Sequence, residues 1–385
     1  MFMEKHQIPF NKPFFAGKEL EYIALAVSNG HISGNGPWAK KCQAWFKERL
    51  AATSALLTTS CTDALEMAAI LTNIGPGDEV ILPSYTFVST ANAFALRGAT
   101  LVFADSRPDH PGFDESTLAE LITPRTRVIV PVHYAGVACN MDRILTLARS
   151  NSIWVVEDAA QAIDAFFTNS KGEKSALGAM GHLGAFSFHE TKNIMCGEGG
   201  LLSVCEPYFK ERAEIIWEKG TNRSQFFRGE IDKYGWVDIG SSFLASDLNA
   251  AFLYAQLEHL DHIQARRKKI WQTYFNGLQP LQDLGVQLPF LPAYASNNGH
   301  LFYLVCRSGK ERDCLISHLR QQGIHAVFHY QSLHSSPYFA SKHDGRNLTQ
   351  SDRYSECLLR LPLYFELSEA DQERVIEAVL KFYAH

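Results

Sequence analysis

Four side chains that could take part in chemistry lie close together in the segment SFHETKNIMCGEGG, residues 187–200. They are His189 as a base, Glu190 as an acid, Lys192 as an amine nucleophile and Cys196 as a thiol. A lysine in a loop is usually solvated. Lys192, however, follows a strand-like apolar run and precedes glycines, which allow the backbone to approach a ligand. An amine that is desolvated there has a lowered pKa and can form Schiff bases.

Other interpretations of this segment fail on spacing. HETKN begins like the zinc motif H-E-x-x-H, but Asn193 stands where the second histidine is required. Cys196 has no base near it in the sequence, and G-x-S-x-G is absent. The chain also lacks G-x-G-x-x-G after a strand and the phosphate loop G-x-x-x-x-G-K-[ST]. We therefore predict no metal site, no Rossmann dinucleotide site and no P-loop.

Hydroxyl side chains precede a helical pattern in TTSCTDALEMAA, residues 58–69. Ser60 with Asp63 three residues later is typical of a helix N-cap. The free amides and the dipole of such a helix start also favour a phosphate. The two interpretations, a cap and an anion site, are compatible.

An apolar run ends with two carboxylates in VVEDAAQA, at Glu157 and Asp158. Burying a carboxylate costs several kcal/mol unless it is paired with a cation or hydrogen-bonded. A salt bridge in the core or a surface turn would explain both residues, so Asp158 becomes informative only with a cation opposite it. Phe87 lies among hydroxyl residues in PSYTFVSTANA, where an aromatic side chain is most often part of the core.

Taken together, these places suit one ligand, pyridoxal 5′-phosphate (PLP). PLP needs an anion site, a carboxylate beside its pyridinium nitrogen, an aromatic side chain over its ring and a lysine for covalent attachment. The residues that we assign to these four needs are Ser60, Cys61, Thr62 and Ser187, then Asp158, Phe87 and Lys192. The carboxylate keeps the ring protonated, and the ring supplies the cation that a buried Asp158 requires.

Short β-rich runs alternate with helical patterns between residues 55 and 204, which predicts βαβ units and a largely parallel sheet. The predicted strands are 79–87, 100–105, 127–134, 153–160, 184–190 and 200–204, and the predicted helices are 63–74, 89–98, 116–122 and 141–151. The last two strands lie too close for a helical crossover, which predicts a mixed sheet there.

A long helical pattern at 245–278 changes its apolar spacing near Arg266, and we interpret it as a helix that enters a second domain. The C-terminal part mixes strands at 301–306 and 325–330 with helices at 311–323 and 368–384. We therefore predict an α/β protein with a large domain at 1–262 and a smaller α+β domain at 263–385. A single core rarely exceeds about 250–300 residues, which agrees with two domains.

Composition excludes several classes of function. The chain has 385 residues and a net charge of −5, which gives no reason to expect nucleic acid or an anionic membrane as a partner. Its eight scattered cysteines form no C-x-x-C pair and predict no disulfide framework. The N-terminal residues lack the apolar run of a signal peptide, and no apolar stretch approaches the length of a membrane helix. We expect a cytoplasmic protein without membrane insertion.

The sequence resembles the sugar aminotransferases of the DegT/DnrJ/EryC1/StrS group from about Ile8 to the C-terminus. The resemblance lies in TTSCTDALEMAA, PSYTFVSTANAFALRGA, PVHYAGVACNMD, VVEDAAQA, FSFHETKN with GEGG, KGTNRSQFFRG with DIGSSFLASDLNAA, AVFHYQSLH and LLRLPLYF. It implies a PLP enzyme with the aspartate aminotransferase (type I) fold. It also implies a homodimer whose active site is shared between subunits.

The resemblance also implies roles for individual residues. Lys192 matches the lysine that binds PLP, Asp158 the pyridinium partner, and Gln161 the residue near the ring hydroxyl. The phosphate site matches Ser60, Cys61, Thr62 and Ser187, and the stacking aromatic matches Phe87. In the family, a neighbouring subunit reaches the phosphate from the segment GSSFLASD. Many members have an asparagine there, whereas this chain has Ser241 and Ser242, of which we assign Ser242. The candidates for substrate binding are Asn222, Arg223, His329, Tyr330 and His334.

FHETKN, KGTNRSQFFRG and PVHYAGVACNMD resemble one subgroup of the family. Its members transfer an amino group from L-glutamate to the 4-keto group of dTDP-4-dehydro-6-deoxy-D-glucose in enterobacterial common antigen synthesis. Amination of another 3- or 4-keto nucleotide sugar is the alternative. PLP-dependent 3-dehydratases of keto sugars carry a histidine at the position of Lys192, which disfavours that activity. A non-catalytic PLP-binding or nucleotide-sugar-binding protein would be expected to have lost Lys192 or Asp158. The motifs do not support a cysteine- or metal-dependent hydrolase.

Overall fold

The large domain is built on one mixed sheet. The computed structural model describes residues 6–384. Residues 1–5 of the predicted large domain and residue 385 of the predicted small domain lie outside the described residues. In the described part, the strands of the main sheet follow the order β1-β9-β8-β5-β4-β2-β3. Their bounds are β1 (Ser54–Thr58), β2 (Glu79–Pro83), β3 (Thr100–Ala104), β4 (Thr126–Ile129), β5 (Trp154–Asp158), β8 (Leu183–Ser187) and β9 (Gly200–Val204).

Strands β3, β2, β4, β5 and β8 run parallel, as the alternation with helices predicts. The mixed end of the sheet is also confirmed, because β9 is antiparallel to β8. Strand β1 was not predicted. It is a five-residue edge strand antiparallel to β9, and its apolar run is too short to stand out beside the helix pattern that follows it.

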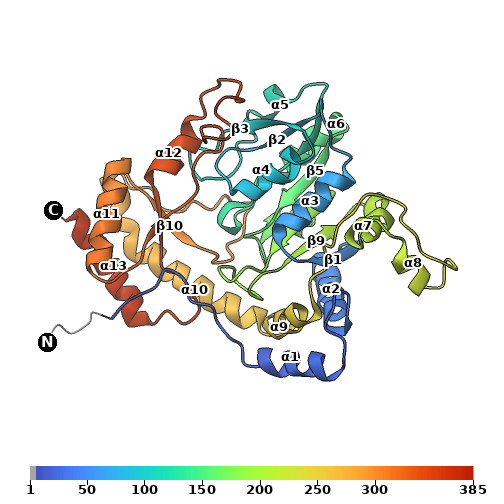
Figure 1. Cartoon of the computed structure of the whole chain (residues 1–385). Coiled ribbons are helices and arrows are strands. Elements are labelled where there is room, and N and C mark those ends of the chain that lie inside the picture. Colours follow the sequence, from blue (N-terminus) through green and yellow to red (C-terminus); the bar gives the residue numbers. More distant parts are fainter. Residues whose placement is uncertain (1–5, 385) are drawn as a thin grey trace.

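Helices cover both faces of this sheet (Figure 1). Because side chains alternate along a strand, Val155 packs in the core under one face and Val156 in the core under the other. The helices are α1 (Glu19–Ser28), α2 (Pro37–Leu50), α3 (Cys61–Leu71), α4 (Val88–Ala95), α5 (Leu118–Leu121), α6 (Met141–Ser150), α7 (Lys210–Trp217), α9 (Asp247–Leu257) and α10 (Leu260–Leu278), with 3-10 turns η1 (Tyr134–Gly136) and η2 (Pro207–Phe209). Residues of α2, α6 and α9 lie in the first core, and residues of α3, α4 and α7 in the second.

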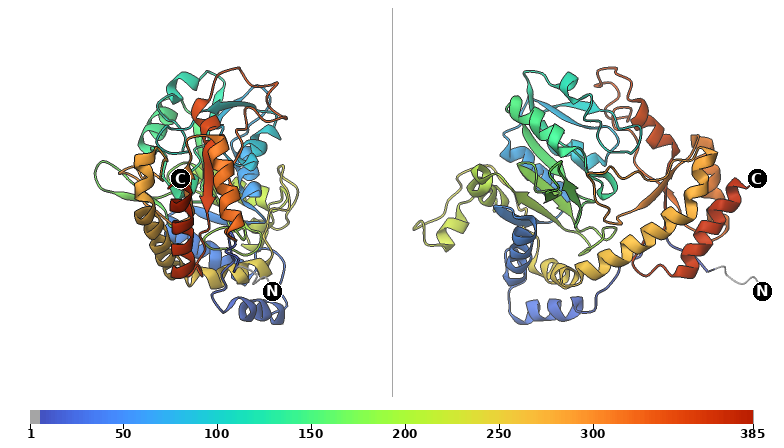
Figure 2. Two further views of the ribbon diagram at one scale, coloured as in Figure 1. Left: turned by 90° about the vertical axis from the view of Figure 1, so that its left-hand side faces the viewer. Right: turned by 180° about the vertical axis from the view of Figure 1, so that it is seen from behind.

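The predicted single helix at 245–278 is wrong in one respect, because it is two helices. The chain breaks between α9 and α10 at Glu258 and His259, not near Arg266. Leu257, Leu260 and Ile263 on both sides of the break lie in the same core, so the apolar pattern does not reveal it. Figure 2 shows α10 running from the large domain into the small one.

The smaller domain contains the sheet β10-β12-β11. Its elements are η3 (Gln279–Leu284), β10 (Phe302–Val305), α11 (Gly309–Gln321), β11 (Val327–Phe328), α12 (Thr349–Cys357), β12 (Leu358–Leu361) and α13 (Glu369–Tyr383). Ile8 from the N-terminal segment packs in its core with Ile270 and Trp271 of α10. Helix α10 therefore contributes to a core of the large domain at its start and to the core of the small domain further along. The exact domain boundary at residues 262 and 263 stays a prediction.

Two smaller features complete the chain. Strands β6 (Phe166–Thr168) and β7 (Lys174–Ala176) form a hairpin. The segment after α7, which includes α8 (Arg223–Phe227), projects from the body as an arm, coloured yellow-green in Figures 1 and 2. No helix within residues 6–384 is long and apolar enough to cross a membrane.

Candidate active site

A cavity of about 840 Å³ lies where the ends of β5 and β8, the start of α3 and the small domain come together. Ten of the residues that the sequence singles out line it: Ser60, Cys61, Thr62, Phe87, Asp158, Gln161, Ser187, Lys192, His329 and Tyr330. Parallel strands bring polar residues at their carboxyl ends to one edge of the sheet, which explains this convergence.

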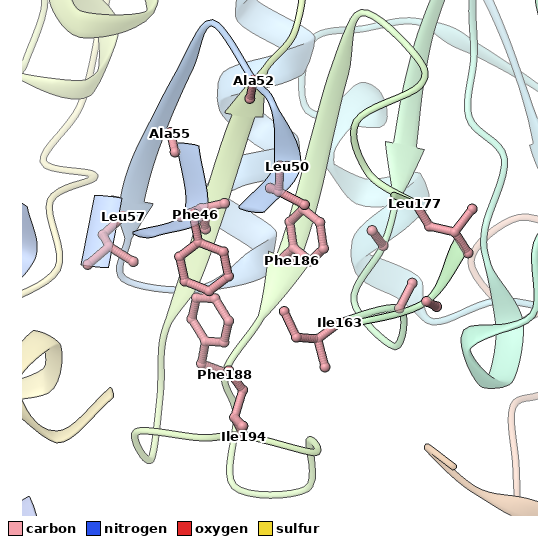
Figure 3. Packing of buried hydrophobic residues seen from close by; sticks show 14 of the residues in the cluster. Phe46, Leu50, Ala52, Ala55, Leu57, Ile163, Leu177, Phe186, Phe188 and Ile194 are labelled. Atoms are coloured by element: carbon pink, nitrogen blue, oxygen red, sulfur yellow. The ribbon is translucent and has the colours of Figure 1, made fainter. Parts of the chain in front are cut away.

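The loop that carries Lys192 is held by apolar side chains on both sides. Phe188 precedes it and Ile194 follows it, and both are fully buried. Figure 3 shows them in the cluster with Phe46 and Phe186, and the rings of Phe46 and Phe188 lie 5.3 Å apart. Lys192 itself is partly exposed at the cavity wall. Burial lowers the pKa of its amine below the ordinary value.

Asn193 fixes the other end of the lysine loop. Its Nδ2 donates to Gln264 Oε1 at 2.7 Å and to the Asn298 carbonyl at 2.9 Å. Its Oδ1 accepts from His300 Nδ1 at 2.7 Å. These bonds join the loop to α10 and to the start of the small domain. Asn193 entered the sequence argument only as the residue that rules out a zinc motif, and its anchoring role depends on partners far away in the sequence.

Asp158 is a buried carboxylate at the cavity wall. It is 6% exposed and accepts hydrogen bonds from Thr90 Oγ1 at 2.7 Å and the Ala160 amide at 3.1 Å. It forms no salt bridge within residues 6–384, although the Lys192 amine is near enough to interact with its charge. The alternative of a core salt bridge therefore does not apply to Asp158, whereas Glu157 does pair with His133. A buried carboxylate is stabilised by a cationic group, and the cavity that Asp158 lines is where a pyridinium ring would supply one.

Glu157, its neighbour, is satisfied by the protein alone. The carboxylate accepts from the amides of Gly178, Met180 and Gly181 at 2.8, 2.7 and 2.5 Å, and from His133 Nε2 at 2.8 Å. Both Glu157 and His133 are fully buried. The two adjacent carboxylates thus differ: Glu157 holds the end of β5 in place, and Asp158 is left for a ligand.

We therefore expect Glu157→Gln to lower the free energy of unfolding by about 2–4 kcal/mol, because one carboxylate oxygen becomes an amide group that faces backbone donors. Urea unfolding followed by circular dichroism measures this loss. Glu48→Gln, at an exposed position of α2, is the matched control and should change stability by less than about 0.5 kcal/mol. Equal stability of the two variants would contradict this role for Glu157.

The start of α3 combines a cap with an open anion site. Ser60 is the N-cap, and its Oγ accepts from the Asp63 amide at 3.1 Å, which confirms the predicted cap. The first amides of the helix have no acceptor within it. Thr62 Oγ1 donates to Ser89 Oγ at 2.8 Å, and both residues line the cavity. These groups and Ser187 Oγ form a donor set suited to a phosphate.

One expectation about the glycines needs correction. Gly200 does not make room for a ligand. A Cβ there would lie 2.3 Å from the Ser60 carbonyl carbon, so the glycine lets β9 pack against the backbone at the start of α3. The geometry of the anion site therefore depends on this close approach between β9 and the helix start.

Aromatic side chains form another part of the wall. Phe87 is 55% exposed, so the interpretation of Phe87 as a core residue is wrong. It precedes α4 and lies 6.0 Å from the Tyr330 ring. Tyr330 accepts a hydrogen bond from Gln161 Nε2 at 2.9 Å and stacks on His329 at 3.6 Å. An exposed ring at this edge suits stacking on a flat heterocycle.

Two of the histidines that line the cavity, His300 and His329, have a lowered pKa, which favours their neutral form. Burial lowers the pKa of His329 and of His300 well below the ordinary value, and the nearby charges of Arg360 and Lys192 act in the same direction. His329 Nδ1 lies 2.6 Å from the Tyr134 hydroxyl. These side chains therefore add hydrogen-bonding groups to the cavity without adding charge.

Four predicted residues lie outside the lining of this cavity. Asn222 and Arg223 are on the projecting arm, where the Arg223 guanidinium lies 5.0 Å from the Phe227 ring. Ser242 is exposed and pairs with Glu218 at the base of that arm. His334 is buried behind the wall, with Nδ1 2.7 Å from Ser84 Oγ. Their proposed roles require a ligand or a second subunit to reach them.

The residues present fit PLP. The cavity offers a partly buried amine of lowered pKa, a buried carboxylate without a salt bridge in the described residues, an open helix start with hydroxyl groups and an exposed ring. Reasoning from the sequence missed further lining residues, namely Ser89, Thr90, His300 and Arg360. Ser89 and Thr90 belong to the quoted segment PSYTFVSTANA and could have been found by their position after a strand, whereas Arg360 lies in the other domain.

Comparisons with known proteins agree with this site. Residues 15–380 match the DegT/DnrJ/EryC1/StrS aminotransferase family. The spore coat polysaccharide biosynthesis protein SpsC of Bacillus subtilis is 32% identical over 97% of this chain and 96% of its own length. Among solved structures, the aminotransferase TlmJ from Streptoalloteichus hindustanus has a TM-score of 0.89 and 30% identity, over 98% of this chain and 99% of its own. DesV of S. venezuelae, solved with a ketimine intermediate, has a TM-score of 0.87 and 31% identity over the same shares.

Proposed function

The chain belongs to the DegT/DnrJ/EryC1/StrS aminotransferase family, and we propose that it aminates the 4-keto group of dTDP-4-dehydro-6-deoxy-D-glucose with L-glutamate as donor. The products are dTDP-4-amino-4,6-dideoxy-D-galactose and 2-oxoglutarate. That the enzyme is a PLP-dependent sugar aminotransferase follows from the family and the structural relatives. The observation that carries the assignment of the site is the pairing of Lys192 and Asp158 in one cavity.

Residues of the cavity would hold PLP at five points. Lys192 would bind the aldehyde carbon, Asp158 would face the ring nitrogen, and Phe87 would stack on the ring. The start of α3 with Ser60, Cys61 and Thr62, together with Ser187, would bind the phosphate, and Gln161 would lie near the ring hydroxyl. When bound, PLP takes up the amino group and accepts the electrons of the bond broken at the reacting carbon.

The chain's own chemistry is proton transfer. Lys192 Nζ would remove the proton from glutamate Cα, because Lys192 is the only lysine among the described residues that line the cavity. In the second half of the reaction the same amine delivers a proton to sugar C4. The lowered pKa of Lys192 favours the uncharged amine, which is the form that attacks and that accepts a proton.

The sugar, the donor and the pathway rest on the resemblance to one subgroup. The name of the Bacillus subtilis relative, a spore coat polysaccharide biosynthesis protein, supports a role in making a surface glycan. We propose enterobacterial common antigen as that glycan and the cytoplasm as the place of reaction. The presence of Lys192 supports amination over the 3-dehydratase alternative, which uses a histidine at that position.

We also propose a homodimer with shared active sites. The arm exposes several large apolar side chains, with Phe227 67% and Trp236 84% exposed. Apolar residues gathered on a projecting arm are typical of an interface. Ser242, at the base of the arm, would reach the phosphate site of the partner subunit, and Asn222 and Arg223 would approach the substrate there.

Incubation with L-glutamate and dTDP-4-dehydro-6-deoxy-D-glucose, followed by NMR of the product, tests this function. We expect a 4-amino sugar of galacto configuration and an equal amount of 2-oxoglutarate. A 3-dehydro substrate serves as the comparison and should give no product. Amination of that sugar alone, or a gluco-configured product, would refute the proposed substrate, whereas loss of the 3-hydroxyl group would indicate the dehydratase.

A further inference from the structure

Arg360 is a partly buried cation in the cavity wall that forms no salt bridge within residues 6–384. Its guanidinium donates through Nη2 to the Phe328 carbonyl at 3.2 Å and lies 4.6 Å from the centre of the Phe10 ring. Its Nε has no acceptor in the described part of the chain. The groups that act on its charge are tyrosines, and no aspartate or glutamate of the described residues is among them. A buried guanidinium donor such as this Nε is rarely left without an acceptor.

The sheet of the small domain directs Arg360 to the cavity. Side chains alternate along β12, so Leu359 and Leu361 pack in the core of the small domain. Leu358 and Arg360 lie on the other face. Leu358 packs in a cluster with Tyr85 and Tyr134 of the large domain, and Arg360 lines the cavity. Phe10 covers one face of the guanidinium, which leaves its edge for a flat, bidentate anion.

Arg267 provides a contrast within the same cavity wall. Arg267 is fully buried and, within residues 6–384, also lacks an acidic partner, but its Nε donates to the Gly299 carbonyl at 3.0 Å and its Nη2 to the carbonyls of His300 and Leu363 at 2.6 and 3.4 Å. Those bonds join α10 to the small domain. The Nε of Arg267 thus has a backbone acceptor, whereas the Nε of Arg360 has none in the described residues.

We propose that Arg360 binds a carboxylate of the amino donor, L-glutamate, and of its keto acid product. The inference rests on the proposed function and names the residue that selects the donor. Besides the phosphate of PLP, the proposed reaction brings two kinds of anion into this cavity, the carboxylates of the donor and the diphosphate of the nucleotide sugar. The positive charge of Arg360 is close enough to Lys192 to lower the pKa of that amine. The α-carboxylate of glutamate is one bond from the reacting carbon, whereas the diphosphate lies across the sugar ring from C4, which favours the carboxylate.

The test measures the two halves of the reaction separately in the variants Arg360→Leu and Arg360→Lys. The control is Arg320→Leu, at an exposed position of α11, which removes the same charge as Arg360→Leu. Binding of 2-oxoglutarate and of dTDP to the PLP-loaded enzymes is measured by calorimetry. Conversion of the cofactor by glutamate alone, and amination of the sugar by the pre-aminated enzyme, are followed by absorbance. Each measurement has the native enzyme as its reference.

We expect Arg360→Leu to weaken 2-oxoglutarate binding and the glutamate step about 100-fold, since a charged hydrogen-bonding partner is lost. Arg360→Lys keeps the positive charge but not the pair of guanidinium donors, and it should weaken 2-oxoglutarate binding and the glutamate step about 10-fold. The sugar step and dTDP binding should stay within about 3-fold of the native enzyme, as should every property of Arg320→Leu.

Other outcomes overturn the inference. Loss of dTDP binding with 2-oxoglutarate binding unchanged would assign Arg360 to the diphosphate instead. If both variants react with glutamate and bind 2-oxoglutarate as the native enzyme does, Arg360 binds neither carboxylate and the proposal is wrong. If Arg360→Leu fails to fold, Arg360→Lys alone decides, because its charge is retained and only the bidentate geometry is removed. A native enzyme that does not react with glutamate would instead refute the proposed function.

Discussion

Lys192→Ala should abolish turnover, with kcat lowered by more than about 10⁴-fold. The substitution removes both the covalent attachment of PLP and the amine that moves the proton. Lys192→Arg should be as inactive, because a guanidinium keeps the positive charge but is neither a nucleophile nor a base at neutral pH. Steady-state assays measure the loss, and reduction with borohydride followed by peptide mass spectrometry shows whether the cofactor is still attached.

The control for this prediction is Lys171→Ala, at an exposed lysine between β6 and β7, which should leave kcat unchanged. Both Lys192 variants should fold normally, since the amine lies at a cavity wall and the loop is held by Phe188, Ile194 and Asn193. Full activity in either Lys192 variant, or a reduced cofactor attached at another lysine, would contradict the role of this residue.

Asp158→Asn should lower kcat by about 10²–10³-fold and weaken the binding of PLP, because the ring nitrogen loses the charge that keeps it protonated. The same substitution should not destabilise the protein without PLP. Asp158 is a buried charge without a salt bridge in residues 6–384. Removing the charge should therefore offset the one hydrogen bond that the amide loses, from Thr90 or from the Ala160 amide. Fluorescence titration with PLP and thermal unfolding of the cofactor-free protein measure the two effects.

This pair of readouts distinguishes a ligand-binding carboxylate from a structural one. Glu157→Gln, at the adjacent residue, should lower stability, because its carboxylate accepts four hydrogen bonds from the protein. Asp158→Asn should lower activity with stability unchanged. If the cofactor-free protein lost several kcal/mol with Asp158→Asn and bound PLP normally, Asp158 would be a structural residue.

The cavity could be predicted from sequence because its main residues follow strands. Lys192, Asp158 and Ser60 stand at strand ends or at a helix start, and the parallel sheet brings these positions together. The sequence pattern could not show whether the Phe87 side chain is buried or faces the cavity, since an aromatic residue after a strand is equally common in the core. Its exposure depends on where α4 begins.

Residues whose role depends on contacts between domains were beyond the reach of the sequence. Arg360 follows an apolar run, a pattern that also fits an exposed position of a short strand. Only the packing of β12 against the large domain directs it to the cavity. Asn193 likewise has no local signal for its bonds to Gln264 and Asn298. The break between α9 and α10 has no signal in the sequence, since the apolar residues on both sides of it pack in one core.

One amine, Lys192, is expected to take part in both halves of an amino transfer between glutamate and a keto sugar. The most direct measurement is a two-step single turnover. The PLP-loaded protein is mixed with L-glutamate alone, the excess is removed, and dTDP-4-dehydro-6-deoxy-D-glucose is added. We predict about one equivalent of 2-oxoglutarate per subunit in the first step and about one equivalent of the 4-amino sugar in the second. Failure to form 2-oxoglutarate without the sugar, or the same yields from Lys192→Ala, would contradict this central role of Lys192.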